Sequence, residues 1–99
     1  MRQFDVCPLR APAKGMVVVL QNDVIGDLAT RVVAPLSAAA GVPPIGRLQI
    51  GVAVGDQSYL VQVDRLSTIH RAALGPSIAH LRDHETELKR SLDFLFFGI

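Results

Sequence analysis

The sequence predicts an α+β fold that is mostly β, with an antiparallel sheet followed by a long C-terminal helix. Short runs of β-branched and apolar residues recur along most of the chain, separated by turn residues, and they favour strands. Two of these runs flank Gly55-Asp56, a dipeptide typical of a β-hairpin turn. From His80 onward, leucines recur at helical spacing instead. Because strands precede a single helix, we expect the helix to pack on one sheet.

Five strands are expected before the helix, and they are Gln3–Cys7, Met16–Gln21, Thr30–Ala34, Arg47–Val54 and Gln57–Val63. Met16–Gln21 is an unbroken apolar run up to its glutamine, so we expect this strand to be buried on both faces or in a dimer. Pro35 is expected to end the third ladder or to place that strand near an edge, because proline has no backbone N–H to donate.

The connections are rich in turn residues. Pro8–Gly15 reads as an exposed loop and Ser37–Gly46 as a long loop. Val24–Leu28 reads as an irregular connection, in which Val24 and Ile25 belong either to the core or to an exposed apolar patch. Ser67–Leu74 is expected to form a short helical turn with Ser67 as its N-cap, stopped by Gly75-Pro76.

The expected helix runs from His80 to about Phe97 and has one apolar stripe. At about 100° per residue, the stripe residues fall within about 40° of its centre, and they are Leu81, Leu88, Leu92, Leu95 and Ile99. Phe97 falls on the opposite face with Thr86, Arg90 and Asp93, Phe94 also points away from the core, and Phe96 lies on the flank. These leftover aromatic residues belong either to a frayed end or dimer contact, or to a partner-binding tip made of Phe97, Gly98 and Ile99.

Composition predicts one domain over residues 1–99 that is not disordered, since 49% of the residues are hydrophobic and 19% are charged. The net charge of +1 argues against nucleic-acid binding through a strong basic field. Cys7 is the lone cysteine, so it cannot form an internal disulfide, and we expect a small buried strand residue in a reducing cytoplasm. No signal-peptide core or bilayer-length apolar run is seen, which favours a soluble cytoplasmic protein without membrane contact.

No pattern of catalytic residues stands out. His80 and His84 are four residues apart, a spacing that can hold zinc on a helix, but no third ligand is identifiable and a solvated helix face is the simpler reading. Asp64, Ser67 and His70 are not spaced as a catalytic triad. Four arginines have two readings, as binders of phosphate or RNA or as ordinary surface charges. They are Arg31, Arg47, Arg65 and Arg71. We therefore expect a binding protein without catalytic residues, metal or cofactor.

Several segments match one family in order and spacing, and they are Gln3–Val6, Leu20–Asp23, Thr30–Leu36, Gly75 and Leu92–Ile99. With these segments the chain resembles the CcdB toxins, the toxin halves of bacterial type II toxin–antitoxin modules. The resemblance implies a homodimer of an SH3-barrel-like antiparallel fold with a C-terminal helix. It also implies that the protein inhibits DNA gyrase, by gripping its A subunit and trapping the cleaved-DNA complex, and meets DNA only indirectly through gyrase or an antitoxin.

The resemblance also assigns residues to the gyrase contact. The family's terminal Trp-Gly-Ile corresponds to Phe97, Gly98 and Ile99, and Phe96 matches the preceding aromatic residue. Val24 and Ile25 match an assisting apolar pair, and Asp93 stands where a polar helix residue helps. Phenylalanine in place of tryptophan loses the indole N–H and buried area, so weakened gyrase poisoning is expected.

The second implied partner is a CcdA-like antitoxin whose disordered tail folds onto the toxin. Arg10 and Lys14 in the loop Pro8–Gly15 are candidate contacts for it. Two alternatives stay open beside the gyrase inhibitor. One is a degenerate, non-toxic homologue that acts only in antitoxin binding and autoregulation, and the other is a MazF-like endoribonuclease.

Overall fold

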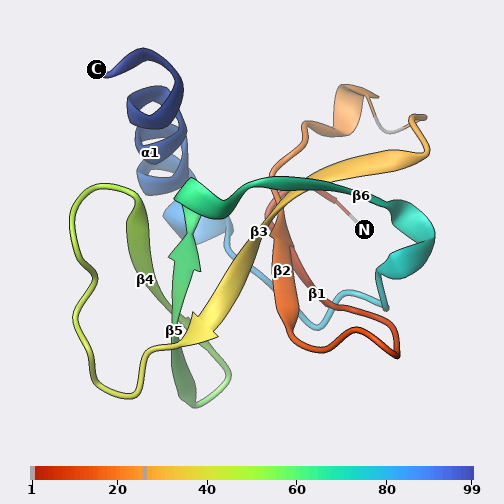
Figure 1. Cartoon of the computed structure of the whole chain (residues 1–99), viewed down its shortest axis with the longest axis horizontal. Coiled ribbons are helices and arrows are strands. Elements are labelled where there is room, and N and C mark those ends of the chain that lie inside the picture. Colours follow the sequence, from red (N-terminus) through yellow and green to blue (C-terminus); the bar gives the residue numbers. More distant parts are fainter. Residues whose placement is uncertain (1, 26) are drawn as a thin grey trace.

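The computed structural model describes residues 2–25 and 27–99, which form an antiparallel sheet of seven strands and one α-helix (Figure 1). The strands are β1 (Asp5–Pro8), β2 (Met16–Val19), β3 (Thr30–Ala38), β4 (Gln49–Val54), β5 (Gln57–Gln62), β6 (Ser67–His70) and β7 (Ala79–His80). The helix is α1 (Glu85–Phe97). Short 3₁₀ turns are η1 (Asp23–Ile25), η2 (Val63–Arg65), η3 (Arg71–Ala73) and η4 (Arg82–His84).

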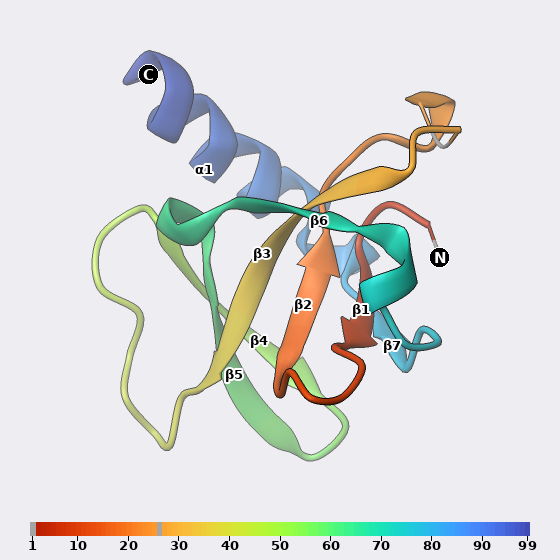
Figure 2. The same cartoon turned by 45° about the vertical axis from the view of Figure 1, so that its right-hand side comes forward.

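The strand order is β4-β5-β3-β2-β1-β7, and β6 pairs with β3 outside this path. β5 and β6 follow each other in the chain and pair with different halves of the same long strand. The sheet curls, and α1 lies across one end of it with its C-terminal end pointing away (Figures 1 and 2). The predicted fold class, a mostly β α+β fold with an SH3-barrel-like sheet and a C-terminal helix, is confirmed.

Of the two readings left open for Met16–Gln21, the structure supports burial on both faces within one chain. Val18 and Leu20 belong to the larger core cluster, which also contains Leu81 and Leu88 of the C-terminal segment. Val17 and Val19 point to the other face and join a second cluster. Successive strand residues alternate between the two faces of a sheet, so β2 contributes to both clusters. Its sequence therefore shows no apolar–polar alternation.

The predicted hairpin around Gly55-Asp56 is confirmed, with β4 and β5 in register from Gln49↔Gln62 to Val54↔Gln57. Gly55 has a φ of +61°, which a glycine adopts without strain. The first strand begins later than predicted, at Asp5. Phe4 has a φ of +69°, and this left-handed conformation interrupts an extended backbone.

The expected effect of Pro35 was wrong, because β3 continues through it to Ala38. The N–H of Leu20 donates to the carbonyl of Val32, so the backbone groups of Val32 point toward β2. Backbone groups of successive strand residues point to alternate edges, and Pro35 is three residues further on, so its nitrogen points to the opposite edge. On that edge, β6 pairs with Thr30–Val33 and β5 with Leu36–Ala38. Pro35 lies in the gap between the two partners, where its missing N–H removes no ladder hydrogen bond.

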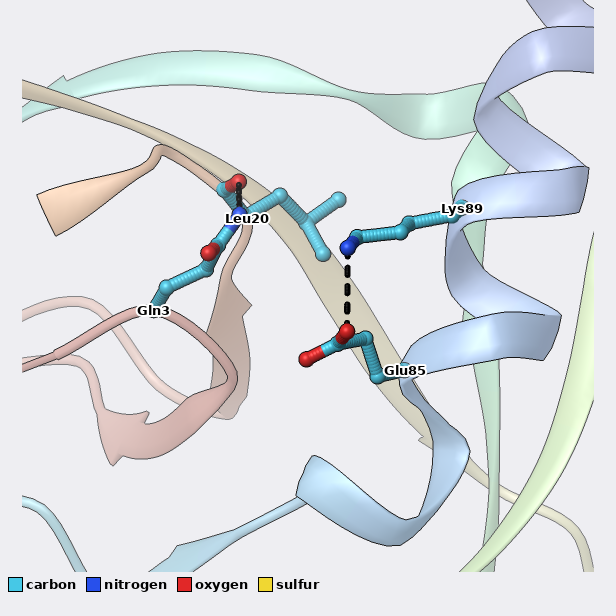
Figure 3. Close-up of polar contacts among 4 residues, drawn as sticks. All are labelled: Gln3, Leu20, Glu85 and Lys89. Atoms are coloured by element: carbon cyan, nitrogen blue, oxygen red, sulfur yellow. Dashed lines mark hydrogen bonds and ion pairs between the residues drawn. The ribbon is translucent and has the colours of Figure 1, made fainter.

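Two helix predictions also need correction. Ser67 does not cap a turn, because Ser67–His70 is strand β6 and the helical turn is confined to η3. The long helix begins at Glu85, so His80, in β7, and His84, in η4, do not share a helical face. An i,i+4 ion pair between Glu85 and Lys89, 2.9 Å long, lies in the first turns of α1 (Figure 3).

Candidate functional site

The helix α1 is fixed to the sheet by its leucine stripe. Leu81 and Leu88 are buried, and Leu92 and Leu95 pack partly buried against the same core cluster. The buried hydroxyl of Ser91 donates to the backbone carbonyl of Arg47 at 2.7 Å, which ties the middle of the helix to the segment before β4. The predicted helical stripe is therefore confirmed for Leu88, Leu92 and Leu95, whereas Leu81 lies before the helix and is buried in the same core cluster. The sheet holds the helix and its C-terminal end in a defined position.

The end of α1 carries an exposed apolar tip. Phe97 is 72% exposed and Ile99 80%, and the Phe96 ring, also exposed, has its centroid 6.4 Å from that of Phe97. Gly98 has a φ of +71°, and its N–H donates to the carbonyl of Phe94 at 2.9 Å, the usual way in which a glycine ends a helix. Because the helix ends at this cap, Ile99 leaves the leucine stripe, and its predicted place on the buried face was wrong.

The charge around this tip favours a cationic partner. Asp93 is exposed one turn before Phe97, and the last turn of α1 has no basic residue. The free carbonyl groups at the C-terminal end of a helix add partial negative charge. An aromatic face beside this charge is suited to a guanidinium or an ammonium group, which cation–π attraction also favours.

A second exposed apolar patch lies on η1. Val24 is 89% and Ile25 51% exposed, so of the two open readings the exposed patch is the correct one. The side chain of Asn22 accepts from the N–H of Val24 at 2.8 Å, and that of Asp23 accepts from the N–H of Gln3 at 2.7 Å. Both side chains bind backbone groups, so they hold the turn and leave the apolar side chains free to contact a partner.

Two glutamines brace this turn, and although both lie in the segments that match the family, no role was predicted for them from the sequence. Gln21 is buried, donates to the carbonyl of Ile25 at 3.0 Å, and accepts from the N–H of Val32 at 3.3 Å. Gln3 donates through its side chain to the carbonyl of Leu20 at 3.0 Å (Figure 3). The sequence did carry a signal for Gln21, because it is a polar residue directly after the apolar run Met16–Leu20.

The two apolar patches do not meet within one chain. In both views, η1 and the end of α1 lie on opposite sides of the molecule, although both project from the same end of the sheet (Figures 1 and 2). A surface that uses both patches therefore needs either one partner that reaches across the molecule or a second copy of this chain.

The two candidate antitoxin contacts differ in their surroundings. The side chain of Arg10 donates through Nε to the carbonyl of Leu74 at 3.0 Å, and its backbone N–H donates to Ala73 at 2.9 Å. Arg10 thus anchors the loop Pro8–Gly15 to the segment after η3. Lys14 is exposed on the same loop.

The histidines are occupied by local contacts. Nδ1 of His70 accepts from the N–H of Ala72 at 3.0 Å, and Nδ1 of His84 lies 2.8 Å from a carboxylate oxygen of Glu87. Within residues 2–25 and 27–99, no three His, Cys, Asp or Glu side chains cluster as metal ligands. The thiol of Cys7 is buried in β1, as predicted, and this burial, followed by the negative charge of Asp5, raises its pKa.

The fold is similar to that of several solved structures. The chain superposes on the Mycobacterium tuberculosis toxin MazF-mt6 with a TM-score of 0.78 and 23% identity, over 93% of this chain and 95% of that one. A second structure, described as an Mtb toxin, gives a TM-score of 0.77 at 22% identity, over 92% and 99% of the two chains. An endoribonuclease in complex with its cognate antitoxin, from a mycobacterial species, gives 0.78 at 13% identity, over 96% and 93%.

In the part of the chain that the structure describes, no helix has the length and apolar character needed to cross a membrane. The family model of the CcdB protein matches residues 3–98. This match spans nearly the whole sequence and includes Phe97 and Gly98 of the helix tip and the braced turn. The chain therefore belongs to the CcdB family, the toxins of toxin–antitoxin systems.

Proposed function

We propose that this toxin inhibits DNA gyrase by binding its A subunit through the tip of α1 and trapping the cleaved-DNA complex. The observation that carries the proposal is the exposure of Phe97 and Ile99 at the end of a helix whose other face is anchored in the core. Large exposed apolar side chains on a rigid support are typical of protein-binding sites. In this role the protein acts as an inhibitor of a topoisomerase and needs no catalytic residue or cofactor of its own.

Each residue of the proposed gyrase contact has a distinct task. Phe97 supplies the stacking face, and Phe96 and Ile99 surround it with apolar area. Gly98 turns the chain so that Ile99 leaves the helix axis. Asp93 adds a negative charge beside the ring. A phenyl ring offers a smaller stacking surface than an indole, so the proposed inhibition is weaker than that of a tryptophan-bearing relative.

Val24 and Ile25 assist this contact in our proposal, and the protein acts as a homodimer. The two patches lie apart within one chain, and a second copy of the chain would bring them onto a common surface that one gyrase subunit can contact. Further exposed apolar residues, among them Leu28 and Ile78, agree with an interface between copies. A small domain also gains stability by oligomerising.

The second proposed partner is a CcdA-like antitoxin that neutralises the toxin. Support comes from the family and from a neighbouring structure described as an endoribonuclease in complex with its cognate antitoxin. Both proposed partners work in the bacterial cytoplasm, where we place the protein. DNA contact is indirect, through gyrase or through the antitoxin.

The direct test is a supercoiling and DNA-cleavage assay with purified gyrase from the source organism. The full chain is compared with a variant that lacks Phe97–Ile99, and circular dichroism checks that both are folded. We expect cleaved-DNA complexes with the full chain and none with the truncated variant. Cleavage complexes of equal yield with both proteins would exclude the helix tip as the gyrase contact.

Two other functions compete, and the same preparation separates them. The neighbouring structures include endoribonuclease toxins, which makes RNA cleavage the second candidate. Specific cleavage of messenger RNA by the purified protein, without effect on gyrase, would replace the gyrase proposal. Absence of both activities, with normal growth on induction and binding to an antitoxin, would identify a degenerate homologue that acts only in autoregulation.

A further inference from the structure

Beside the helix tip, a guanidinium group is held in place with its hydrogen-bond donors unused. The guanidinium carbon of Arg47 lies 4.1 Å from the centroid of the Phe94 ring, and stacking of this kind fixes the plane of the group. Among residues 2–25 and 27–99, Arg47 and Arg90 have no carboxylate or carbonyl partner for their guanidinium groups. Stacking leaves the in-plane N–H groups of Arg47 available for an acceptor.

These two arginines line a cavity of about 350 Å³, together with Gln49, Ile50, Glu87 and Ser91. The side-chain oxygen of Gln49 accepts from the N–H of Ile45 at 2.9 Å, so its amide NH₂ is left to donate. Glu87 is the one carboxylate in this lining, and it is 2.8 Å from Nδ1 of His84. The hydroxyl of Ser91 already donates to the carbonyl of Arg47, so the groups left to donate are the two guanidinium groups and the amide of Gln49, which is the chemistry that binds a carboxylate.

A second cavity of about 360 Å³ adjoins the first, since Arg47 and Gln49 line both. Its other walls include Ile45, Leu48 and Phe94, so it is largely apolar, with Asp64 as its carboxylate. An occupant of both cavities needs a carboxylate next to an apolar side chain. A peptide offers this alternation, whereas a nucleic acid does not, and the net charge of +1 gives a polynucleotide no broad attraction.

We infer that Arg47, Arg90 and Gln49 form a carboxylate-binding site, and that this site and the adjoining apolar cavity take an acidic, leucine-like segment of the antitoxin. Arg90, Phe94 and Phe97 follow each other at spacings of four and three residues, so they share the outer face of α1. The site is about 10 Å along the helix from Phe97.

That the occupant is a segment of the antitoxin rests on the proposed function, whereas the site itself can be tested without gyrase. The probe is a fluorescein-labelled hexapeptide of alternating glutamate and leucine, titrated by anisotropy into the full chain. Arg47→Gln and Arg90→Gln are each expected to weaken binding about tenfold, the usual loss for a charge-assisted pair. The control is Arg82→Gln, which removes the same charge from an exposed arginine in η4, outside both cavities, and is expected to change affinity less than twofold.

Two further probes distinguish the occupant. Phe94→Leu keeps the charge of Arg47 but removes its stacking platform, and we expect a smaller loss, about threefold. Hexaglutamate should bind more weakly than the alternating peptide, because it cannot fill the apolar cavity. In NMR spectra of the labelled chain, the alternating peptide should shift the amide signals of Arg47 and Arg90.

Several results would overturn the inference. The first is the lack of saturable peptide binding up to millimolar concentration, and the second is an equal loss in Arg82→Gln and the two cavity variants. A third is tighter binding of a single-stranded RNA hexamer than of the peptide through the same two arginines, which would assign the site to nucleic acid. Failure of gyrase inhibition, with peptide binding intact, would instead count against the proposed target alone.

Discussion

The N–H of Gly75 donates to the carbonyl oxygen of Pro8 at 2.7 Å, and a Cβ on Gly75 would lie 2.9 Å from Cγ of Pro8. Beside this bond, Leu9 and Leu74 form an isolated antiparallel bridge. The segment after η3 is thereby held against the end of β1. Such a close approach requires a residue without a side chain, which explains why glycine occupies position 75.

Gly75→Ala is therefore expected to destabilise the fold. The added methyl group must displace Pro8, and overpacking of this kind costs about 1–3 kcal/mol in the free energy of unfolding. Gly51→Ala is the matched control, because a Cβ there meets only Pro44, at 3.9 Å. Urea unfolding monitored by circular dichroism measures both. Equal midpoints for the two variants would show that the contact with Pro8 relaxes without cost.

Gln21→Ala is expected to loosen η1 without disrupting the sheet. The substitution removes the donor to Ile25 and the acceptor for Val32, and loss of two such hydrogen bonds costs about 1–3 kcal/mol. Hydrogen exchange at the amides of Val24 and Ile25 should become faster. If these residues assist gyrase binding, inhibition weakens in parallel.

The control for Gln21 is Gln57→Ala, which removes an exposed glutamine that accepts only from the hydroxyl of Tyr59. Its free energy of unfolding should stay within about 0.5 kcal/mol of the parent. Unchanged hydrogen exchange at η1 in Gln21→Ala would show that Asn22 and Asp23 hold the turn without help from the glutamine.

The parts of the fold that could be predicted are those encoded by apolar or turn residues close together in the sequence. The hairpin around Gly55-Asp56 and the leucine stripe of α1 depend on residues a few positions apart, and both were placed correctly. The errors have non-local causes. Pro35 is tolerated because β5 and β6 divide one edge of β3 between them, and no pattern near residue 35 encodes that division.

The candidate site was predictable to a similar extent. Helical projection placed Phe97 away from the buried stripe, because the angle between two helix positions follows from the sequence alone. It could not decide between core and surface for Val24 and Ile25, since a single 3₁₀ turn has no periodicity to read. The stacking of Arg47 on Phe94 joins distant segments, so only the folded chain brings it to light.

Cys7 should react slowly with iodoacetamide in the folded protein at neutral pH. Burial and the charge of Asp5 raise the pKa of its thiol, so the reactive thiolate is scarce and inaccessible. We expect alkylation to be at least about a hundredfold slower than in guanidinium chloride, measured by mass spectrometry. Rates within tenfold of each other would show that β1 opens readily in the native state.

The raised pKa of Cys7 also predicts how stability changes with pH. The unfolded thiol ionises first, near its ordinary pKa of about 8.5, while the folded thiol stays protonated. The contribution of the Cys7 thiol to the free energy of unfolding is therefore fully present below the unfolded pKa and is lost as pH rises through the folded pKa. The difference in unfolding free energy between the parent and Cys7→Ala should stay constant from about pH 6 to 8. Above about pH 8 this difference should shrink, because the parent loses the contribution of its thiol. A difference that grew with rising pH would contradict the raised pKa.

Substitutions at Phe97 should change gyrase inhibition with little effect on stability. The ring is 72% exposed, so Phe97→Ala removes little buried area from the fold, and unfolding free energies should agree within about 0.5 kcal/mol. Phe97→Ala is expected to lose inhibition by at least about tenfold, whereas Phe97→Trp should gain, because an indole offers a larger stacking face and a donor N–H.

The control for Phe97 is Val42→Ala, which trims an exposed apolar residue on the loop between β3 and β4 that is not part of the proposed contact. The concentration that halves supercoiling by purified gyrase is measured for each protein. Val42→Ala should match the parent, because its exposed side chain lies outside the proposed contact. A Phe97→Trp variant no more inhibitory than the parent would mean that ring size does not limit the contact. Loss of inhibition in Val42→Ala equal to that in Phe97→Ala would place the gyrase contact on a broader surface than the tip.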